Sequence, residues 1–396
     1  MLTFEEAQKR VLALAKVRPA ESVALDACAG RVLAEDVRAP ADVPSFAAST
    51  MDGFAVRAAD VGDDPMPVAG ESRAGGAAPE LAPKSACRVF TGAPMPRGAD
   101  AVIMQEDADR SGDAVRFRTR PAAGAFVRRR GDDLRAGEIA LARGARLGAA
   151  EIAMLCGLDR ADARVAGAPR VVVVPTGDEL REPGAAGGPS SIAESNSRAV
   201  AAMAGRAGAR VERRAPVPDD EPRVRAAFAS ALDACDVLVT IGGVSVGEHD
   251  LVRGALEACG VRLDFWRVAI KPGKPLAIGA RGDAVVVGLP GNPVSALVTF
   301  ALFGVPLLRA MQGDARPSPR PSRARLAAPV TRKSGRLELA RARFDEAGRV
   351  ALLPNQASAA IVGLCRAEVL ACLPRDAERL ETGDEIDVFD RAELGL

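Results

Sequence analysis

Residues 236–250 of the chain read DVLVTIGGVSVGEHD, and this stretch decides the fold class. An apolar run over 236–242 passes directly into a glycine-rich loop, and the start of a helix over about 248–259 follows it. A short apolar run bounded by turn residues is typical of a buried strand in a parallel sheet. The stretch therefore predicts a strand, a loop and a helix of an α/β domain.

The segments on both sides repeat this alternation of strands and helices. The sequence RVVVVP at 170–175 is a second continuous apolar run. Strands that alternate with helices imply a doubly wound α/β domain, which we place at residues 166–312. The predicted elements are strands at 170–175, 210–217, 236–242, 263–269 and 284–288, and helices at about 195–208, 220–233 and 248–259.

The uncharged run over 284–308 is long enough to span a membrane. Glycine, proline and asparagine interrupt it between Gly288 and Pro293, however, and lipid does not tolerate exposed irregular backbone. The run therefore predicts a buried strand, a tight loop and a buried helix from about Pro293. We expect no membrane partner.

Three smaller parts are predicted outside the α/β domain. Thr3 and Glu6 match a capping box for a helix over 3–17. Glycine and proline punctuate short apolar runs over 44–133, and a segment rich in proline, serine and arginine over 313–329 predicts a linker. The predicted parts are a linking domain at 1–43 and 134–165 (with a helix near 149–156, and the N-terminal helix free to pack elsewhere), a β-rich module at 44–133, and a small C-terminal β-domain at 313–396.

The composition excludes several classes of function. The 53 basic residues balance 52 acidic ones, so the chain lacks the basic excess of a general nucleic-acid binder. With one histidine, His249, neither a histidine-rich zinc site nor a two-histidine relay can be built. The seven cysteines have no CxxC spacing, which indicates reduced, mostly buried thiols. We expect a cytoplasmic protein without a signal peptide and without nucleic acid as a partner.

The glycine-rich loop at 240–250 is suited to bind an anion. Its glycines let backbone amides turn toward a ligand, and the following helix start adds partial positive charge. Ser245 could donate to a phosphate oxygen, and Glu248 and Asp250 could share a divalent cation with it. A tight turn before a capped helix would explain the loop equally well. The glycines concerned are Gly242, Gly243 and Gly247.

Lys271-Pro-Gly-Lys274 is a second candidate for anion binding. The chain has only six lysines beside 47 arginines, yet two of them lie three residues apart around this turn. Lysine is a compact point charge, whereas arginine is a planar fork. The alternative is a solvated turn without a ligand.

The loop 288–295, with the sequence GLPGNPVS, follows a buried strand and precedes a buried helix. Pro290 and Pro293 fix φ, and Gly291 permits an unusual backbone conformation. A stiff loop at the carboxyl end of a parallel strand lies where open α/β sheets bind ligands. A rigid helix start with Pro293 in its first turn is the alternative.

Scattered carboxylates complete the candidate site. Each of these carboxylates could also have a purely structural role. For example, Asp219 or Asp220 could cap the helix at 220–233, and Asp178 could occupy a turn. The carboxylates singled out are Asp52, Asp133, Glu179 and Asp219.

Taken together, the motifs occur in a recognisable order along the chain. They are MDGFA (51–55), TGAP (91–94), RRRGDD (128–133), PTGDEL (175–180), ESN (194–196), GGVSVGEHD (242–250), KPGKP (271–275) and GLPGNPVSA (288–296). In this order the chain resembles the molybdopterin molybdenumtransferase family, which includes MoeA and the E domain of gephyrin. The resemblance covers essentially the whole chain.

The resemblance implies an activity and a fold. Members insert molybdate into adenylylated molybdopterin and release AMP, with Mg²⁺ assisting cleavage of the pyrophosphate link. The implied architecture is a multidomain α/β plus β protein with a doubly wound, MogA-like pterin-binding domain, a β-rich module, an elongated linking domain and a C-terminal β-barrel-like domain. The implied partners are adenylylated molybdopterin, molybdate, a second copy of the chain in a homodimer, and the upstream molybdopterin adenylyltransferase.

The resemblance also assigns roles to residues of this chain. Glu179, Asp219 and Asp250 match acidic positions near the nucleotide, and Glu179 and Asp250 are the implied metal ligands. Pro290 and Pro293 match the loop beside the pterin. The implied molybdate-binding residues are Lys271, Lys274, Arg336 and Ser358, and the functional positions of the β-rich module, which faces the site of the partner subunit in the family, are Asp52, Thr91 and Asp133.

Two departures and two alternative functions remain. Arg267 stands where the family often has lysine, and Phe54 stands where it often has tyrosine. The alternatives are the adenylyltransferase of the preceding step and a gephyrin-like scaffold. More than half of the chain lies outside the α/β domain, which the adenylyltransferase reaction alone would not need, and the retained lysines and carboxylates argue against a scaffold.

Overall fold

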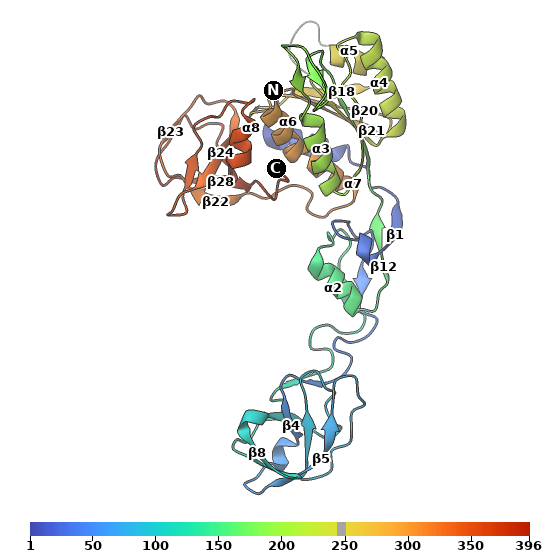
Figure 1. Ribbon diagram of the computed structural model, residues 1–396, viewed down its shortest axis with the longest axis vertical. Coiled ribbons are helices and arrows are strands. Elements are labelled where there is room, and N and C mark those ends of the chain that lie inside the picture. The colour runs from blue at the N-terminus through green and yellow to red at the C-terminus, as the bar shows by residue number, and fades with distance from the viewer. Residues whose placement is uncertain (244–250) are drawn as a thin grey trace. The chain divides into compact units, whose positions relative to one another are not determined.

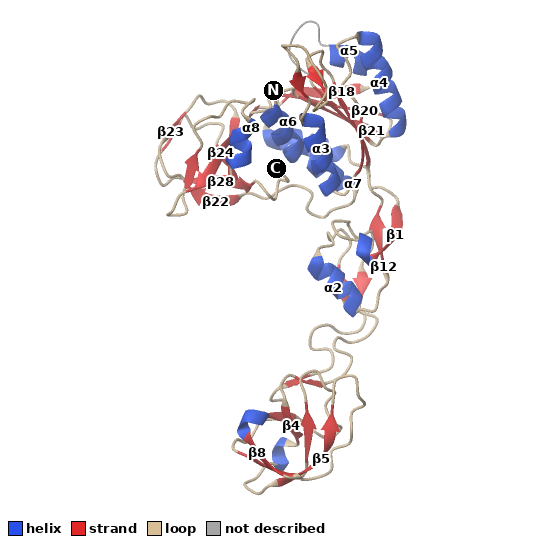
Figure 2. Cartoon of the chain, viewed as in Figure 1, coloured by secondary structure: helices blue, strands red, loops and turns tan. Residues whose placement is uncertain are grey.

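The computed structural model describes residues 1–243 and 251–396. The chain divides into two compact units. The larger unit holds residues 1–35, 143–153 and 161–396, and the smaller unit holds residues 36–142 and 154–160. Figure 1 labels the helices and strands, and Figure 2 distinguishes them by colour. The domain boundaries that we gave from the sequence stay predictions.

The larger unit contains a six-stranded mixed sheet with the order β16-β13-β17-β21-β20-β18. β13 pairs in parallel with β16 and β17, and β17 with β21, whereas β20 is antiparallel to both of its neighbours. The predicted strand at 210–217 ends earlier, at Arg213, and β20 was not predicted. The bounds are β13 (Arg170–Pro175), β16 (Arg210–Arg213), β17 (Val237–Ile241), β18 (Arg262–Arg267), β20 (Pro275–Arg281) and β21 (Ala284–Leu289).

Helices cover both faces of this sheet, as a doubly wound fold requires. Successive strand residues point to opposite faces, so Val172 packs toward α4 and α5 whereas Val171 and Val173 pack toward α3 and the helices after Pro293. The predicted helices at 195–208 and 220–233 are confirmed, and that at 248–259 is confirmed from Leu251 on, since its first three positions lie outside the described residues. Their bounds are α3 (Asn196–Arg206), α4 (Glu221–Ala234), α5 (Leu251–Ala258), α6 (Pro293–Thr299) and α7 (Val305–Met311), with a π-helical turn (Phe300–Gly304) between the last two.

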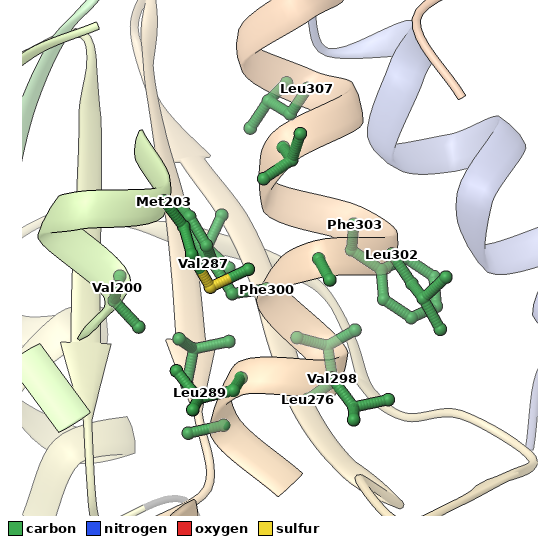
Figure 3. Packing of buried hydrophobic residues seen from close by; sticks show 14 of the residues in the cluster. Val200, Met203, Leu276, Val287, Leu289, Val298, Phe300, Leu302, Phe303 and Leu307 are labelled. Atoms are coloured by element: carbon green, nitrogen blue, oxygen red, sulfur yellow. The ribbon is translucent and has the colours of Figure 1, made fainter. Parts of the chain in front are cut away.

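The helix Pro293–Met311 has the length and hydropathy of a membrane span, but 89% of its most apolar 18-residue stretch is buried inside the protein. Figure 3 shows Val298, Phe300 and Leu307 from this helix against Met203 of α3 and Val287 of the sheet. The segment is therefore a core helix within the larger unit, as its sequence predicted.

The N-terminal helix α1 (Phe4–Ala13) packs on this same core. Thr3 and Glu6 form both bonds of the predicted capping box. Ala7 and Val11 are fully buried, and the ring of Phe4 meets that of Phe303 edge-on at 5.6 Å. This helix is thus part of the α/β core, the packing elsewhere that its sequence left open.

The remainder of the larger unit is mostly strand, and helix α2 is divided between the two units after Ala153. A second sheet has the order β19-β24-β26-β28-β22, with β25 beside β24. The predicted linker at 313–329 is partly wrong, because β22 lies inside it. The bounds are β1 (Ala20–Ala24), β12 (Asp162–Ala166), α2 (Ala149–Gly157), β19 (Ile270–Lys271), β22 (Ser322–Arg325), β23 (Val330–Thr331), β24 (Leu337–Phe344), β25 (Val350–Leu352), α8 (Ile361–Arg366), β26 (Val369–Leu373), β27 (Arg379–Leu380) and β28 (Glu385–Asp390).

The smaller unit is rich in strands, as predicted for 44–133. Its main sheet has the order β7-β4-β6-β5-β9-β8 around a core in which Phe54 meets Phe117 edge-on at 5.9 Å. The bounds are β2 (Val37–Arg38), β3 (Ala48–Ser49), β4 (Gly53–Val56), β5 (Met66–Ser72), β6 (Ala86–Val89), β7 (Ala101–Met104), β8 (Ala108–Ser111), β9 (Ala114–Phe117), β10 (Val127–Arg128) and β11 (Ile139–Leu141).

All seven cysteines are free thiols, and four of them are buried. Burial raises the pKa of Cys87 and of Cys235 to about 11 and that of Cys372 to about 12. These three thiols are therefore protonated at neutral pH and chemically quiet. Cys156 and Cys365 are exposed.

Candidate functional site

A pocket of about 520 Å³ opens at the carboxyl ends of β13, β17 and β21. Open α/β sheets bind ligands at this edge. The short parallel pair β14 (Leu180–Arg181) and β15 (Ile192–Ala193) forms one wall. The lining residues are Thr176, Glu179, Leu180, Ile192, Ala193, Glu194, Ser195, Asn196, Ile241, Gly242, Gly291, Asn292, Pro293 and Ala359.

The described part of the glycine loop needs its glycines for steric reasons. Gly242 has φ +95°, and a Cβ there would lie 2.5 Å from the carbonyl oxygen of Thr176. Gly243 has φ +61°, and its Cβ would lie 2.3 Å from a methyl group of Val252. Gly242 also lines the pocket. The candidate residues Ser245, Gly247 and Asp250, with Glu248 and His249, lie outside the described residues.

Three carboxylates gather beside the pocket. Glu179 lines it, and the backbone amide of Asp219 donates to Asp178 Oδ1 at 3.0 Å. Loss of hydration raises the pKa of Asp219, and the neighbouring charges of Asp178 and Glu179 raise it further. Asp220 is the residue that caps α4, accepting a hydrogen bond from the amide of Arg223. Asp219 is therefore free of the capping role that we considered for it.

The loop after β21 is tied to the start of α3. The side-chain amide of Asn196 donates to the carbonyl of Gly291 at 2.7 Å. Pro290 is buried, and Pro293 occupies the first turn of α6 and lines the pocket. The loop is therefore both a rigid helix start and part of the pocket wall, so the two interpretations given from its sequence are compatible.

The lysine turn lies next to α6. Gly273, in the turn, has φ +102°, and a Cβ there would lie 2.4 Å from the methyl group of Thr299 and 3.7 Å from the carbonyl of Ser295. The amide of Val294 donates to the carbonyl of Ser358 at 3.0 Å. The first turns of α6 thus carry the lysine turn and the Ser358 loop.

The four candidate oxyanion residues are only partly brought together. Lys271 lies on β19, which pairs with β24, and β24 begins directly after Arg336 in the chain. The ammonium of Lys271 lies 2.7 Å from Glu338 Oε1. Lys274, however, lines a different, more open pocket of about 530 Å³ with Trp266 and Arg267. The pocket at the strand ends contains neither lysine among its lining residues.

The candidate residues of the smaller unit form one close pair. Thr91 donates its amide and its hydroxyl to Asp52 Oδ1, at 2.8 and 2.9 Å. These two hydrogen bonds lower the pKa of Asp52. Asp133 instead forms an ion pair with Arg128. Asp52, Thr91 and Asp133 all belong to the smaller unit, and these contacts are contacts within that unit.

Among the residues that the structure describes, no group of three or more histidine, cysteine, aspartate or glutamate side chains could hold a metal ion. Mg²⁺ needs less, because it is usually bound through one or two carboxylates together with water and substrate phosphates. Glu179, Asp178 and Asp219 offer hard oxygen ligands, and loss of hydration, followed by the charges of Asp178 and Glu179, raises the pKa of Asp219. This chemistry fits Mg²⁺.

Three contributors to the site region had no role assigned from the sequence. Asn196 belongs to the ESN motif, which was a usable signal. Glu338 and the fully buried Arg341 lie on a strand whose pattern gave no such signal. Arg341 donates to the carbonyls of Asn355 and Ala357, at 2.8 and 3.1 Å, and so supports the loop that carries Ser358.

The fold and the pocket define a multidomain α/β protein with a ligand site at the carboxyl edge of its sheet. Three family models match successive parts of the chain. They are described as the MoeA N-terminal region (domain I and II) over residues 2–158, a "probable molybdopterin binding domain" over 172–310, and the MoeA C-terminal region (domain IV) over 323–390.

Individual relatives agree with these matches. A molybdopterin molybdenumtransferase of Haemophilus influenzae is 39% identical over 79% of this chain and 78% of its own length. Molybdopterin molybdenumtransferase 2 of Mycobacterium tuberculosis is 36% identical over 98% of this chain and 100% of its own. The solved structure of a molybdopterin biosynthesis MoeA protein from Pyrococcus horikoshii superposes with a TM-score of 0.84 at 28% identity, covering 98% and 100% of the two chains. The chain belongs to the molybdopterin molybdenumtransferase family, a family of enzymes.

Proposed function

We propose that this enzyme inserts molybdate into adenylylated molybdopterin to form the molybdenum cofactor, with release of AMP. The observation that carries the proposal is the match to a curated molybdopterin molybdenumtransferase over 98% of this chain and the whole of the relative. The match spans the full length of that relative, so the proposal extends to the whole chain and is not limited to one domain. The names of the relatives indicate that molybdenum is transferred and that molybdopterin is the acceptor. The release of AMP is part of our proposal.

The pocket at the carboxyl ends of β13, β17 and β21 is the proposed pterin and nucleotide site. Helix α3 begins at its wall, and the start of a helix carries partial positive charge suited to a phosphate. The hydrogen bond from Asn196 to Gly291 fixes the distance between two walls. A rigid pocket of this kind serves chemistry that depends on holding the reacting groups in place.

The chain's own side chains favour electrostatic over acid–base catalysis. It has no tyrosine and a single histidine. Phosphoryl and oxyanion chemistry needs mainly positioning and charge, which lysine, arginine and backbone amides supply. Lys271 and Arg336, brought to neighbouring strands by the pairing of β19 with β24, are the proposed partners of molybdate, together with Lys274 and Ser358.

Mg²⁺ is the proposed cofactor, and when bound it would offset negative charge at the pyrophosphate link. Glu179 and Asp250 would hold it, with Asp219 beside Glu179. Asp250→Asn keeps the shape of the side chain and removes its charge. We expect this variant to fold and to lose AMP release at limiting Mg²⁺, while unchanged release would remove Asp250 from the metal site.

The direct test supplies purified enzyme with adenylylated molybdopterin, molybdate and Mg²⁺. AMP is quantified, and cofactor is detected by activation of a cofactor-free molybdoenzyme. We expect both products to depend on molybdate. A parallel reaction with molybdopterin and ATP-Mg²⁺ tests the adenylyltransferase alternative, because net formation of adenylylated molybdopterin by this protein alone would contradict the proposal.

A homodimer, a cytoplasmic location and an encounter with the upstream adenylyltransferase belong to the same proposal. The encounter with the adenylyltransferase would transfer adenylylated molybdopterin directly, which would protect its phosphoanhydride link from hydrolysis by water. A pull-down between the two purified proteins, with and without adenylylated molybdopterin, tests it.

A further inference from the structure

Glu338 is a carboxylate held inside the larger unit by two cations. Its side chain is only 10% exposed. One carboxylate oxygen, Oε1, lies 2.7 Å from the ammonium of Lys271, and the other, Oε2, lies 3.1 Å from Nε of Arg332. The carboxylate therefore joins β19, which lies in the chain between β18 and β20 of the α/β sheet, to β24, its neighbour in the C-terminal sheet.

Arg332 extends this connection to the turn before β24. Its side chain is 6% exposed. Its guanidinium donates to the carbonyls of Pro374 and Ala377, at 2.6 and 2.9 Å, and to the carbonyl of Arg336. A planar guanidinium that uses several donors at once has a fixed orientation. Glu338 thus holds Lys271 directly and the backbone of Arg336 through Arg332.

The backbone places these groups on adjacent strands. Lys271 is paired with Glu338 in the parallel register of β19 and β24, and the amide of Leu337 donates to the carbonyl of Ala269 at 2.9 Å. The Lys271 side chain is 47% exposed, so its ammonium is held by Glu338 on one side and is open to solvent on another.

We propose that Glu338 is a positioning residue of the oxyanion site, which orients Lys271 directly and Arg336 through Arg332 so that both cations meet one tetrahedral dianion. The proposal rests on the proposed function. A carboxylate behind a ligating group is the arrangement by which proteins orient the residues that contact a metal or an anion. Without it, the flexible lysine stem would sample many rotamers, and only some of them would reach the ligand.

The expected consequence is a change in molybdate affinity more than in the chemical step. Glu338→Gln keeps the shape but can accept from Lys271 and Arg332 with only one oxygen and without charge. Loss of one charge-assisted hydrogen bond to the anion weakens its binding about 10- to 100-fold. We therefore expect the molybdate concentration for half-maximal cofactor formation to rise about 10- to 100-fold, with the rate at saturating molybdate and the binding of molybdopterin changed less than about threefold.

The experiment compares Glu338→Gln with a matched control, Glu385→Gln. Glu385 lies on β28 of the same C-terminal sheet, and its half-exposed carboxylate pairs with Arg323 and Arg325. The control should keep the wild-type molybdate dependence. Both substitutions are also made in a Lys271→Ala background, where Glu338→Gln should add less than about threefold because one of the two cations that it orients is absent.

Glu338→Asp covers the case in which removal of the charge unfolds the protein. Aspartate keeps the charge and retracts the carboxylate by one methylene, so it should raise the required molybdate about 3- to 10-fold in a folded protein. Circular dichroism and thermal unfolding identify the folded variants. Unchanged molybdate dependence in the folded Glu338 variants would overturn the proposal.

Three outcomes would overturn it, each for a different reason. If Lys271→Ala changes the molybdate dependence and the Glu338 variants do not, the proposed function stands and the positioning role is wrong. If Glu338→Gln lowers the required molybdate, Glu338 competes with the oxyanion for Lys271 and does not position it. If the wild-type protein forms cofactor without any dependence on molybdate, the proposed function fails together with the inference.

Discussion

Thr91 donates both its backbone amide and its hydroxyl to a single carboxylate oxygen of Asp52, at 2.8 and 2.9 Å. The two residues come from the motifs MDGFA and TGAP, which are separated by two strands of the smaller unit. The pair gives a physical reason for the joint occurrence of these motifs. An ionised carboxylate is held in a fixed orientation at an exposed position, where ordinary surface carboxylates rotate freely.

Thr91→Val should loosen this pair, because it removes the hydroxyl donor and keeps the amide. The pKa of Asp52, which is lowered mainly by the amide and then by the hydroxyl, should rise partway toward its ordinary value. Since a lowered carboxyl pKa stabilises the fold above the unfolded value, near 3.9, that contribution is lost as the pH falls through the folded pKa. NMR titration of the Asp52 carboxyl measures the change, and Thr91→Ser is the control that keeps the hydroxyl.

The same variant tests whether the pair matters for activity. We expect Thr91→Val to lower cofactor formation about 3- to 10-fold at neutral pH, the effect of one lost hydrogen bond. A wild-type rate in a variant whose Asp52 pKa has moved would make the pair structural only.

Asp219→Asn should stabilise the protein and impair the reaction. Lost hydration and the charges of Asp178 and Glu179 raise the pKa of Asp219. A carboxyl with a raised folded pKa destabilises the fold when ionised, so the penalty appears as the pH rises through that pKa. Without added Mg²⁺ at pH 7, the variant should therefore melt about 1–2 °C higher than the wild type.

The advantage of Asp219→Asn should shrink near pH 3, where the wild-type carboxyl is largely protonated. Its AMP release should fall if the carboxylate serves the nucleotide or metal. Differential scanning calorimetry at the two pH values provides the check, and a lower melting temperature of the variant at pH 7 would contradict the assignment of Asp219 to an uncompensated acidic cluster.

We predict a homodimer, because the resemblance places functional residues on the smaller unit as well as on the α/β site. A site completed across a two-fold interface would account for both sets. Light scattering at micromolar concentration should give about twice the chain mass, and Asp52→Ala and Lys271→Ala subunits mixed together should regain part of the activity that each lacks alone. A fully active monomer would refute the prediction.

The sequence predicted the parallel strands and their helices well. Val171–Val174 is a continuous apolar run and Val237–Ile241 is interrupted only by Thr240, and such runs are typical of strands buried on both faces of a sheet. It missed β20, since Pro275–Arg281 begins with proline, carries a glycine and is antiparallel to its neighbours. β20 is held in the sheet by its antiparallel pairing with β18 and β21, and its own residue pattern does not indicate a strand.

The candidate site was predictable to the extent that its residues carry local signals. Backbone geometry demands the glycines beside Thr176, and the prolines around Gly291, one of which lies in the first turn of α6, stand out in the sequence as well. The contact between Lys271 and Glu338 is a tertiary relationship between distant segments, set by the pairing of β19 with β24. No local periodicity encodes such a contact, so the carboxylate behind the lysine could be found only in the structure.

Molybdate binding should depend strongly on Lys274 and Arg336. A dianion in a partly desolvated site needs charge-assisted hydrogen bonds, each worth about 1.5–3 kcal/mol. Loss of one such bond should raise the required molybdate roughly 10- to 150-fold, at about 1.4 kcal/mol per decade. Lys274→Ala and Arg336→Ala should therefore form cofactor at wild-type rates only with much more molybdate, while molybdopterin binding changes less.

The structure sharpens this last test, because Lys274 lines the pocket beside Trp266 whereas the backbone of Arg336 is tied to the Lys271–Glu338 network. The molybdate dependence of cofactor formation is measured for both variants, with molybdopterin binding measured in parallel. An effect of Arg336→Ala alone would confine the oxyanion to the side of Lys271 and Glu338 and would assign Lys274 to a separate surface. Wild-type molybdate dependence in both variants would show that the oxyanion binds elsewhere.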